Sequence, residues 1–264
     1  GERGSEASPA GSPARAGAQP VRAAGEQDDR AARRDGAEDR SGRGKNDPGR
    51  RGARRANHDR RTREERILRP GARGDRVLAL QRALRDLGYW LGRPDGTYGL
   101  LTEQAVLAFQ GVEGIGRDGA AGPETFGALR SAKRPSPRST RGDLIEIDED
   151  RGALFVVRDG TARWVFHTST GTDEPYSHPS GETLAADTPN GRWTVSWAFD
   201  GWRESDLGEM WRPRYFHADG IAIHGFESVP AYPASHGCAR VSIAAMNLIW
   251  ERDLAPLGST VWVY

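Results

Sequence analysis

The sequence predicts two folded domains after a charged N-terminal segment: a small all-α bundle of three helices, then a mainly β sandwich with one packed helix. Three observations predict this. Residues 1–66 contain one large apolar residue, Val21; apolar residues at helical spacing begin at Ile67; and beyond Asp143 the pattern becomes alternating, with β-branched and aromatic residues. We expect a disordered tail over residues 1–66, a helical domain over 67–130, a linker over 131–142 and a β domain over 143–264.

The charge balance gives no reason to expect binding to nucleic acid or to an anionic membrane. The chain has 38 basic and 37 acidic residues, a net charge of +1. It contains no apolar run of about 18 residues, so we expect no transmembrane segment. Its first residues lack the charged-then-apolar pattern of an export signal. If the protein is exported, the signal is therefore not in the numbered chain.

Apolar spacing predicts the three helices of the first domain. The first lies between Gly74 and Trp90 and ends at Gly88, because glycine is the usual residue just after a helix. The second begins near Thr102 as its N-cap, and the third opens at Pro123. The positions expected to face the core are Val77, Leu80, Leu84, Leu87, Ala105, Val106, Phe109, Phe126 and Leu129.

Asp-Gly turns recur between these helices, at Asp95-Gly96 and again at Asp118-Gly119. Together with the opening Gly71-x-x-Gly74-x-x-Val77-x-x-Leu80-Gln81, they resemble a peptidoglycan-binding domain of the three-helix type. The resemblance covers residues 67–130 and implies binding to cell-wall glycan. A small bundle that closes on the same turns without a ligand is the alternative.

Period-two patterns predict the strands of the second domain. We expect them at residues 144–148, 153–158, 163–168, 192–197, 221–224 and 261–264, with a hairpin turn at Arg158-Asp159-Gly160-Thr161. One helix, residues 243–252, follows Ser242 as its cap, with Met246, Ile249, Trp250 and Leu254 on its apolar side. Such a domain is a sandwich or a partly open barrel.

The chemistry is concentrated in Ser235-His236-Gly237-Cys238-Ala239-Arg240, which contains the only cysteine. A single cysteine excludes an intramolecular disulfide and is either a buried hydrophobic residue or a reactive thiol. A nucleophilic thiol needs a base, since the free thiol pKa is about 8.5. Two histidines are candidates: His236, two residues away, and His224, at the end of a strand before a loop that returns to Cys238.

Zinc is the competing interpretation of the same residues, because His224, His236 and Cys238 are all zinc ligand types. No Cys-x-x-Cys or His-Glu-x-x-His motif accompanies them. We therefore expect no metal and no other cofactor.

The motif, with His224-Gly225 before it and Thr188-Pro189-Asn190-Gly191 further upstream, resembles the L,D-transpeptidase catalytic domain of the YkuD type. The resemblance covers residues 143–264. It implies that Cys238 is the nucleophile, His224 the general base and His236 a residue beside the nucleophile. It also implies that Gly237 and Cys238 offer N–H groups to the oxyanion. The substrate-binding residues it implies are Arg240, Gly225, Ser235, Tyr215 and Met210.

Some members of this family have Ser where this chain has Gly225. The group that holds the imidazole would then be a backbone carbonyl, and the sequence does not identify which one. The segment 198–213, with Trp202, Arg203, Trp211 and Arg212, is either a lid over the cleft or part of the core.

The resemblance implies a secreted, wall-associated enzyme that cross-links peptidoglycan stem peptides with release of D-alanine and is acylated by carbapenem-type inhibitors. Water as the acceptor would make it an L,D-carboxypeptidase. A non-catalytic wall-anchoring protein is the alternative from another class.

Overall fold

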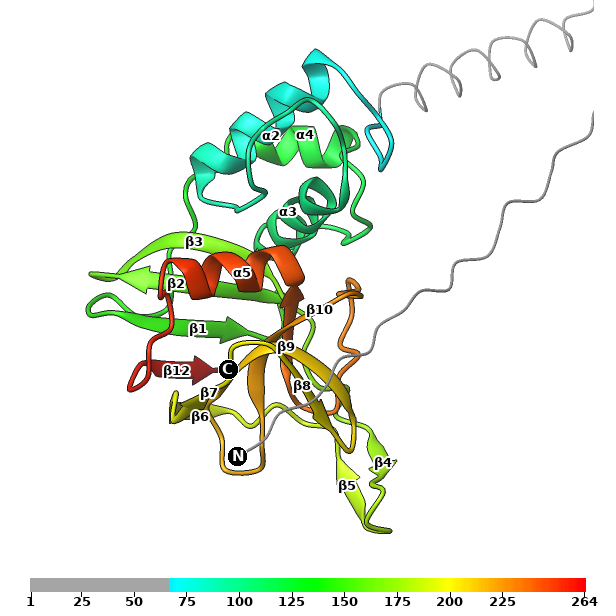
Figure 1. Ribbon diagram of the computed structural model, residues 1–264. Coiled ribbons are helices and arrows are strands. Elements are labelled where there is room, and N and C mark those ends of the chain that lie inside the picture. Colours follow the sequence, from blue (N-terminus) through cyan, green and yellow to red (C-terminus); the bar gives the residue numbers. More distant parts are fainter. Residues whose placement is uncertain (1–66) are drawn as a thin grey trace, which may run out of the picture. The chain divides into compact units, whose positions relative to one another are not determined.

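The helical domain is built as the sequence predicts. The computed structural model describes residues 67–264, and the expected tail lies outside the described residues. Helices α2 (Asp75–Leu87), α3 (Leu100–Val112) and α4 (Pro123–Leu129) form the bundle (Figure 1). Gly88 ends α2 with a φ of 101°, and Pro123 begins α4. None of the helices between residues 67 and 264 is both long and apolar enough to cross a membrane.

A buried glutamine on α2 shapes the first Asp-Gly turn. The Gln81 side chain accepts hydrogen bonds from the N–H groups of Asp95 and Gly96 at 2.9 and 2.8 Å, and donates to Thr102 Oγ1 at 2.9 Å. The prediction of Thr102 as the N-cap of α3 is wrong, because the helix already begins after Gly99. The Thr102 hydroxyl is instead a partner of the buried amide.

Gln110 on α3 repeats this arrangement one helix later. It accepts hydrogen bonds from the N–H groups of Asp118 and Gly119 at 3.1 and 2.9 Å and donates to Thr125 Oγ1 at 3.3 Å. The repeated Asp-Gly turn of the sequence is thus a repeated hydrogen-bonding unit. Each glutamine satisfies backbone groups that would otherwise be buried without partners.

The second domain is mainly β with one helix, as predicted. Its first sheet has the order β3-β2-β1-β12-β6: Thr161–His167, Ala153–Arg158, Leu144–Asp148, Thr260–Val263 and Gly191–Thr194. The second has the order β11-β10-β9-β7: Ala239–Ser242, Ala222–Phe226, Gly208–Tyr215 and Trp197–Ala198, with β8 (Trp202–Ser205) also paired to β9. Strands β4 (Pro175–Ser177) and β5 (Thr183–Ala185) form a separate hairpin, and α5 (Ile243–Glu251) follows its cap Ser242.

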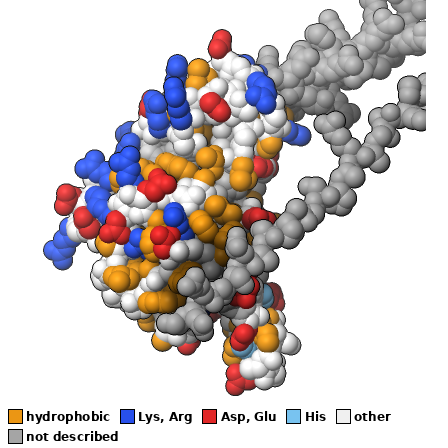
Figure 2. Space-filling view, in the orientation of Figure 1, with side chains coloured by type: hydrophobic (Ala, Val, Ile, Leu, Met, Phe, Trp, Pro, Cys, Tyr) orange, Lys and Arg blue, Asp and Glu red, His pale blue; other side chains and the backbone are white. Residues whose placement is uncertain are grey.

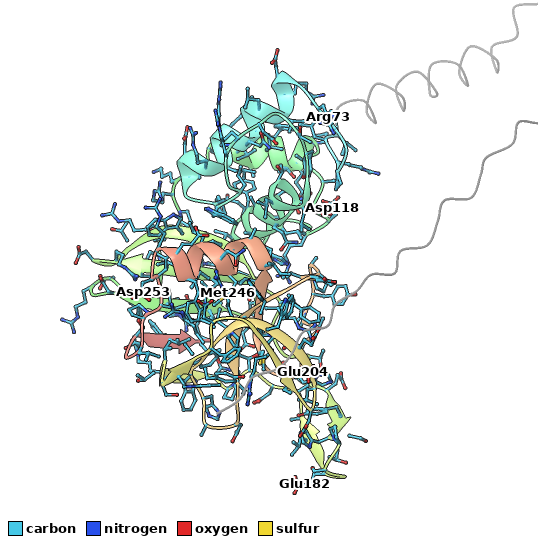
Figure 3. The ribbon with its side chains drawn as sticks, in the orientation of Figure 1. Arg73, Asp118, Glu182, Glu204, Met246 and Asp253 are labelled. Atoms are coloured by element: carbon cyan, nitrogen blue, oxygen red, sulfur yellow. The ribbon has the colours of Figure 1, made fainter. Side chains whose placement is uncertain are left out.

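Two layers of core lie on opposite faces of the first sheet. Alternate residues of β1 to β3, such as Phe155 and Val165, pack with the helical domain, while their neighbours Leu154 and Phe166 pack with the second sheet and α5. Met246 of α5 lies in this second core (Figure 3). Because the first sheet is covered on both faces, β1 is buried along its whole length.

The helical domain joins the first sheet through backbone contacts. The segment after α2 pairs with β3: Trp90 N–H donates to the Val165 carbonyl at 3.0 Å, and Val165 N–H donates to the Gly88 carbonyl at 2.9 Å. Helix α3 approaches the β1–β2 turn so closely that a Cβ at Gly111 would lie 1.9 Å from the Arg151 carbonyl oxygen. Figure 2 shows basic and acidic side chains interspersed on the visible surface, as the balanced composition implies.

The strand predictions differ from the structure mainly in the second sheet. Residues 192–197 were expected to be one strand, but β6 and β7 belong to different sheets, so that expectation is wrong. The chain changes sheets at Val195, whose side chain is buried between them. Five further strands, β4, β5, β8, β9 and β11, were not predicted. Strands β4, β5 and β8 are largely exposed, so they lack the alternation of a half-buried strand.

Candidate active site

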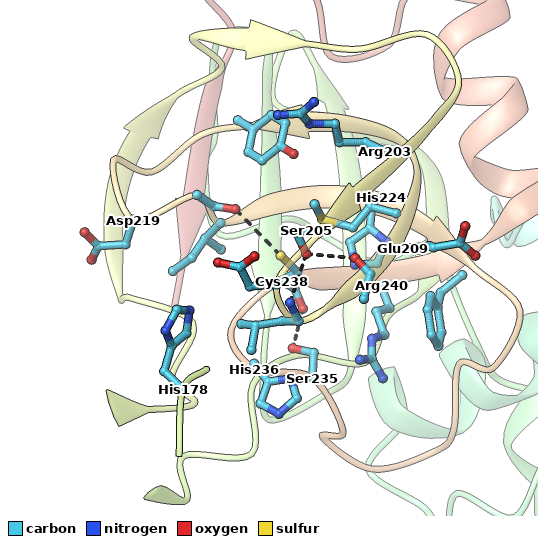
Figure 4. A pocket seen from close by; sticks show the side chains of 18 of the residues that line it. His178, Arg203, Ser205, Glu209, Asp219, His224, Ser235, His236, Cys238 and Arg240 are labelled. Atoms are coloured by element: carbon cyan, nitrogen blue, oxygen red, sulfur yellow. Dashed lines mark hydrogen bonds between the residues drawn. The ribbon is translucent and has the colours of Figure 1, made fainter. Parts of the chain in front are cut away.

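One cavity of about 850 Å³ contains most of the residues expected from the sequence. Its lining comes from the β8–β9 hairpin, the β4–β5 hairpin, β10 and the segment before β10, and from residues 235–240. Figure 4 shows ten of these side chains with labels, among them His224, Cys238 and Arg240. The expected residues that line the cavity are Met210, Tyr215, His224, Ser235, His236, Cys238 and Arg240. Gly225 and Gly237 lie behind the lining and act through their backbone.

The loop that leads to Cys238 is held in place through its carbonyl groups. Gln104 Nε2 of α3 donates to the Val229 carbonyl at 3.1 Å, and Ser169 Oγ donates to the Tyr232 carbonyl at 2.8 Å. A ring nitrogen of His167 lies 2.8 Å from the Pro230 carbonyl oxygen. The loop that connects His224 with Cys238 is therefore supported by both domains and is pre-organised for chemistry.

Ser235 and Thr188 fix the turn immediately before the thiol. Ser235 Oγ donates to the Cys238 carbonyl at 2.6 Å and accepts from Gly237 N–H at 3.0 Å (Figure 4). Thr188 Oγ1 donates to the Gly237 carbonyl at 2.7 Å and accepts from Gly171 N–H at 2.9 Å. Both hydroxyls are thus used as donor and as acceptor, which holds the turn in one geometry.

Gly237 is required at its position for two reasons. Its φ is 128°, and a Cβ there would lie 2.6 Å from the Asp187 carbonyl oxygen. Its N–H is already bound to Ser235 Oγ, which argues against the expectation that this group stabilises an oxyanion. The oxyanion role expected of the Gly237 and Cys238 N–H groups stays a prediction.

The Cys238 thiol is in an apolar setting with one charged neighbour. Burial raises the pKa of the thiol, while the Ala222 N–H, 3.4 Å from Sγ, and the Arg240 guanidinium lower it. Burial is the largest of these effects, so the thiol pKa is raised overall, which favours the thiol over the thiolate. A thiol in this position needs a base to become a nucleophile.

His224 has the electronic state of such a base. Its Nδ1 lies 3.0 Å from the Gly225 carbonyl oxygen, and burial lowers the pKa of the imidazole to about 4. The ring is therefore neutral near pH 7, and the carbonyl favours the tautomer with the proton on Nδ1, so Nε2 is free to accept a proton. Strands β10 and β11 are parallel with His224 opposite Arg240, so these two side chains lie on one face of the sheet, and Cys238 lines the same cavity.

Gly225 supplies the carbonyl that the sequence left unidentified, and its lack of a side chain has a packing reason. A Cβ at this position would lie 2.9 Å from Trp211 Cδ1 and 3.1 Å from Met246 Cβ. Trp211 in turn donates from Nε1 to Asn247 Oδ1 of α5 at 2.7 Å. The tryptophan occupies the space that a serine side chain would need.

His236 does not lie beside the thiol in the way that the i, i+2 argument suggested. Its segment is a loop rather than a strand, its side chain is exposed, and its ring packs on Tyr176 with 4.5 Å between centroids. His236 lines the cavity.

Arg240 brings positive charge to the floor of the cavity. Its Nη1 donates to the Ala234 carbonyl at 2.9 Å, and its guanidinium lies 4.3 Å from the centroid of Phe226. No carboxylate among residues 67–264 forms an ion pair with it, and its buried Nε has no hydrogen-bond partner there. The charge is available to a ligand carboxylate or to a thiolate.

The β8–β9 hairpin forms one wall of the cavity, as a lid would, although only part of the 198–213 segment contributes. Arg203, Met210 and Tyr215 face the cavity, whereas Trp211 packs toward α5. Arg212, with a φ of 50°, interrupts the strand and allows Met210 and Tyr215 to share a face although they are five residues apart. The β4–β5 hairpin, which the sequence did not reveal, contributes Tyr176.

The zinc interpretation receives no support from the arrangement of side chains. Within residues 67–264 no three His, Cys, Asp or Glu side chains are grouped so that they could hold a metal ion.

Comparison with known proteins places both domains in families. The chain matches the peptidoglycan binding domain family over residues 73–129 and the L,D-transpeptidase catalytic domain family over residues 142–263. The crystal structure of the L,D-transpeptidase from Xylanimonas cellulosilytica DSM 15894 is similar, with 46% identity and a TM-score of 0.72. That match covers 75% of this chain and 98% of the other.

Two curated amidases share a shorter region. The N-acetylmuramoyl-L-alanine amidase CwlM of Mycobacterium tuberculosis is 45% identical over 77 residues, which cover 29% of this chain and 18% of the amidase. The amidase CwlL of Bacillus licheniformis is 44% identical over 77 residues, 28% of this chain and 21% of the amidase. The chain therefore spans about a fifth of the length of these curated relatives. The family matches and the similar crystal structure show that the chain belongs to the L,D-transpeptidase family, with a peptidoglycan-binding domain before its catalytic domain.

Proposed function

We propose that the protein is an extracytoplasmic L,D-transpeptidase that cross-links peptidoglycan stem peptides through a thioester on Cys238. The observation that carries the proposal is the position of Cys238 and a neutral, carbonyl-anchored His224 on one cavity wall. Such a pair suits acyl transfer, in which a thiol must lose a proton as it attacks a carbonyl carbon.

In the first half-reaction, Cys238 Sγ bonds to the carbonyl carbon of the third stem residue as its proton passes to His224 Nε2. The tetrahedral intermediate then collapses: the carbon–nitrogen bond breaks, the proton moves from the imidazole to the leaving amine, and D-alanine departs. An acyl-enzyme thioester remains. The Gly225 carbonyl supports the transient imidazolium, because Nδ1–H donates to it throughout.

In the second half-reaction, the side-chain amine of a diamino acid on a neighbouring stem attacks the thioester. Its proton passes through His224 to the departing sulfur, and an amide cross-link forms. The Cys238 N–H and the Arg240 charge act on the oxyanion and on the substrate carboxylate, respectively. Met210, Tyr215 and Ser235 complete the substrate cavity.

The family implies location at the cell wall and reaction with carbapenem-type inhibitors, in which the same thiol opens the β-lactam ring. The peptidoglycan-binding domain would hold the catalytic domain on its polymer and raise the local substrate concentration.

Product analysis tests the proposal and separates it from hydrolysis. The enzyme is mixed with a stem tetrapeptide that carries a diamino acid, and D-alanine, tripeptide and cross-linked dimer are measured by mass spectrometry. Dimer formation that requires Cys238 supports a transpeptidase. Tripeptide alone, at every acceptor concentration, would mean an L,D-carboxypeptidase, and neither product would mean a wall-anchoring protein without activity.

A further inference from the structure

An aromatic strip, defined here as Tyr215, Trp197 and Phe199, leads from the cavity onto the outer surface of the catalytic domain. Tyr215 and Cys238 line the same cavity. Trp197 lies opposite Tyr215 across the β7–β9 pair, with its ring stacked at 4.8 Å and an interplanar angle of 27°. Phe199 continues the row, 6.3 Å from Trp197. The strip therefore begins in the cavity that contains Cys238.

The outer rings of the strip are exposed to solvent. Trp197 is 46% exposed and Phe199 is 37% exposed. Exposed aromatic surface next to a polar cavity is characteristic of a binding surface, because burial of such rings on folding would otherwise be favourable. A planar donor lies beside them: the Arg203 guanidinium is 5.7 Å from the Trp197 ring and lines the cavity (Figure 4).

Trp202 provides an internal comparison, since it is similarly exposed, at 44%, but belongs to a different cluster. Its ring packs on Trp211, 5.1 Å away, and Trp211 is bound to α5. Arg203, the next residue along β8, packs on Trp197 instead. Neighbouring residues of a strand point to opposite faces, so Trp202 lies on the face away from the strip.

We propose that the aromatic strip binds the sugar rings of a glycan strand whose stem peptide occupies the cavity. The proposal rests on the function proposed above. It assigns the sugar part of the donor substrate to the aromatic strip, while the stem peptide is assigned to the cavity. A pyranose ring has an apolar C–H face that stacks on an aromatic ring, and a polar edge of hydroxyl and acetamido groups. Arg203 stands where it can donate to that edge, so ring face and donor occur together.

The geometry favours this occupant over a second protein chain. Three extended residues connect the sugar to the attacked carbonyl and span roughly 10 Å. Tyr215 lines the same cavity as Cys238 and stacks on Trp197, so the strip begins at the cavity that would hold the stem peptide. Three side chains are also far short of the roughly 800 Å² that a stable protein interface buries on each partner.

The test compares two substrates in the full-length enzyme: a disaccharide tetrapeptide and the same tetrapeptide without sugar. The readout is the ratio of their kcat/KM values. Trp197→Ala is expected to lower this ratio by about tenfold or more, on the scale of losing one aromatic stack. Trp197→Phe should restore part of it, and Trp202→Ala, the matched control, should leave it at the wild-type value.

A ratio unchanged in Trp197→Ala, or lowered equally in Trp202→Ala, would overturn the proposal. A second measurement makes the test independent of catalysis. Calorimetry compares the binding of a peptide-free glycan fragment to the single variant Cys238→Ala and to the double variant Cys238→Ala/Trp197→Ala. Weaker binding in the double variant supports the strip even if the enzyme proves to be a hydrolase. If wild type instead forms concentration-dependent dimers that Trp197→Ala abolishes, and the kcat/KM ratio is unchanged, the strip would be assigned to contact with a second copy of the chain.

Discussion

Replacing Gly225 with alanine should damage both stability and catalysis, because a single methyl group enters a filled space next to His224, the proposed general base. The new Cβ would lie 2.9 Å from Trp211 Cδ1 and 3.1 Å from the Cβ atoms of Trp211 and Met246. Two of these three atoms are Cβ atoms, which cannot move without their backbone. Relief therefore requires β10 to shift against β9 or α5.

The magnitude follows from the cost of overpacking, about 1–3 kcal/mol for one extra carbon in a well-packed core. The shift also displaces the Gly225 carbonyl that lies 3.0 Å from His224 Nδ1. Misplacement of a reacting group by about 1 Å can lower a rate by roughly two orders of magnitude. We expect the acylation rate to fall by about 10- to 100-fold.

Urea denaturation and single-turnover acylation measure the two effects separately. The matched control is Gly116→Ala, because Gly116 has no heavy atom within 4 Å of an ideal Cβ and has no positive φ. Its stability should stay within about 0.5 kcal/mol of wild type. Wild-type stability and acylation in Gly225→Ala would refute the packing argument.

Three further predictions concern stability. Burial lowers the pKa of His224 to about 4, so the unfolded state binds more protons between about pH 4 and 6.5, and the free energy of unfolding linked to this group is lost as pH falls through that window. Burial raises the pKa of Glu149 to about 7, which changes stability with pH in the opposite sense, so the contribution of His224 is isolated by comparing wild type with His224→Gln. Between about pH 4 and 6.5, the difference between their free energies of unfolding in urea should change by up to about 3 kcal/mol. A difference that stays constant with pH would contradict a buried neutral histidine. Gln81→Met and Gln110→Met should each lower the free energy of unfolding by about 2–4 kcal/mol, because each leaves two turn N–H groups without their acceptor. A loss of stability below about 0.5 kcal/mol in thermal or urea unfolding would argue against the repeated hydrogen-bonding unit. Gly111→Ala should cost about 3 kcal/mol, since its Cβ would overlap the Arg151 carbonyl, and unchanged urea unfolding would mean that the two domains do not pack as described.

The sequence was most informative where periodicity or turn chemistry is local. Helix α2 could be bounded because Leu84 repeats the apolar spacing and Gly88 ends it in a left-handed conformation. The β2–β3 turn could be placed from Asp159-Gly160, both of which have positive φ. These features depend on residues close together in the chain.

Features that depend on tertiary contacts were missed. Thr102 looked like an N-cap, but its hydroxyl is taken by Gln81, which is 21 residues away. Strand β9 contains Pro213 and a positive φ at Arg212, which break its alternation, so the sequence gives no strand signal there.

The residues of the candidate site could be predicted from the sequence more completely than their arrangement in space. Cys238, His224 and Arg240 were identified from the motif, and the structure gathers them on one wall. The i, i+2 argument failed for His236, because it assumed a strand that begins only at Ala239. The Ser235 bond to Gly237 N–H could not be foreseen, since it depends on the conformation of the turn.

The most direct test of the account is rapid-quench intact-mass measurement of the enzyme after mixing with stem tetrapeptide. We predict a mass gain equal to the tetrapeptide minus D-alanine, located on Cys238 and absent from Cys238→Ala. The adduct should form roughly two or more orders of magnitude more slowly in His224→Ala. It should form at a rate close to wild type in His236→Ala, whose side chain is exposed and packs on Tyr176. An adduct on Cys238→Ala, or a wild-type rate in His224→Ala, would contradict the central claim.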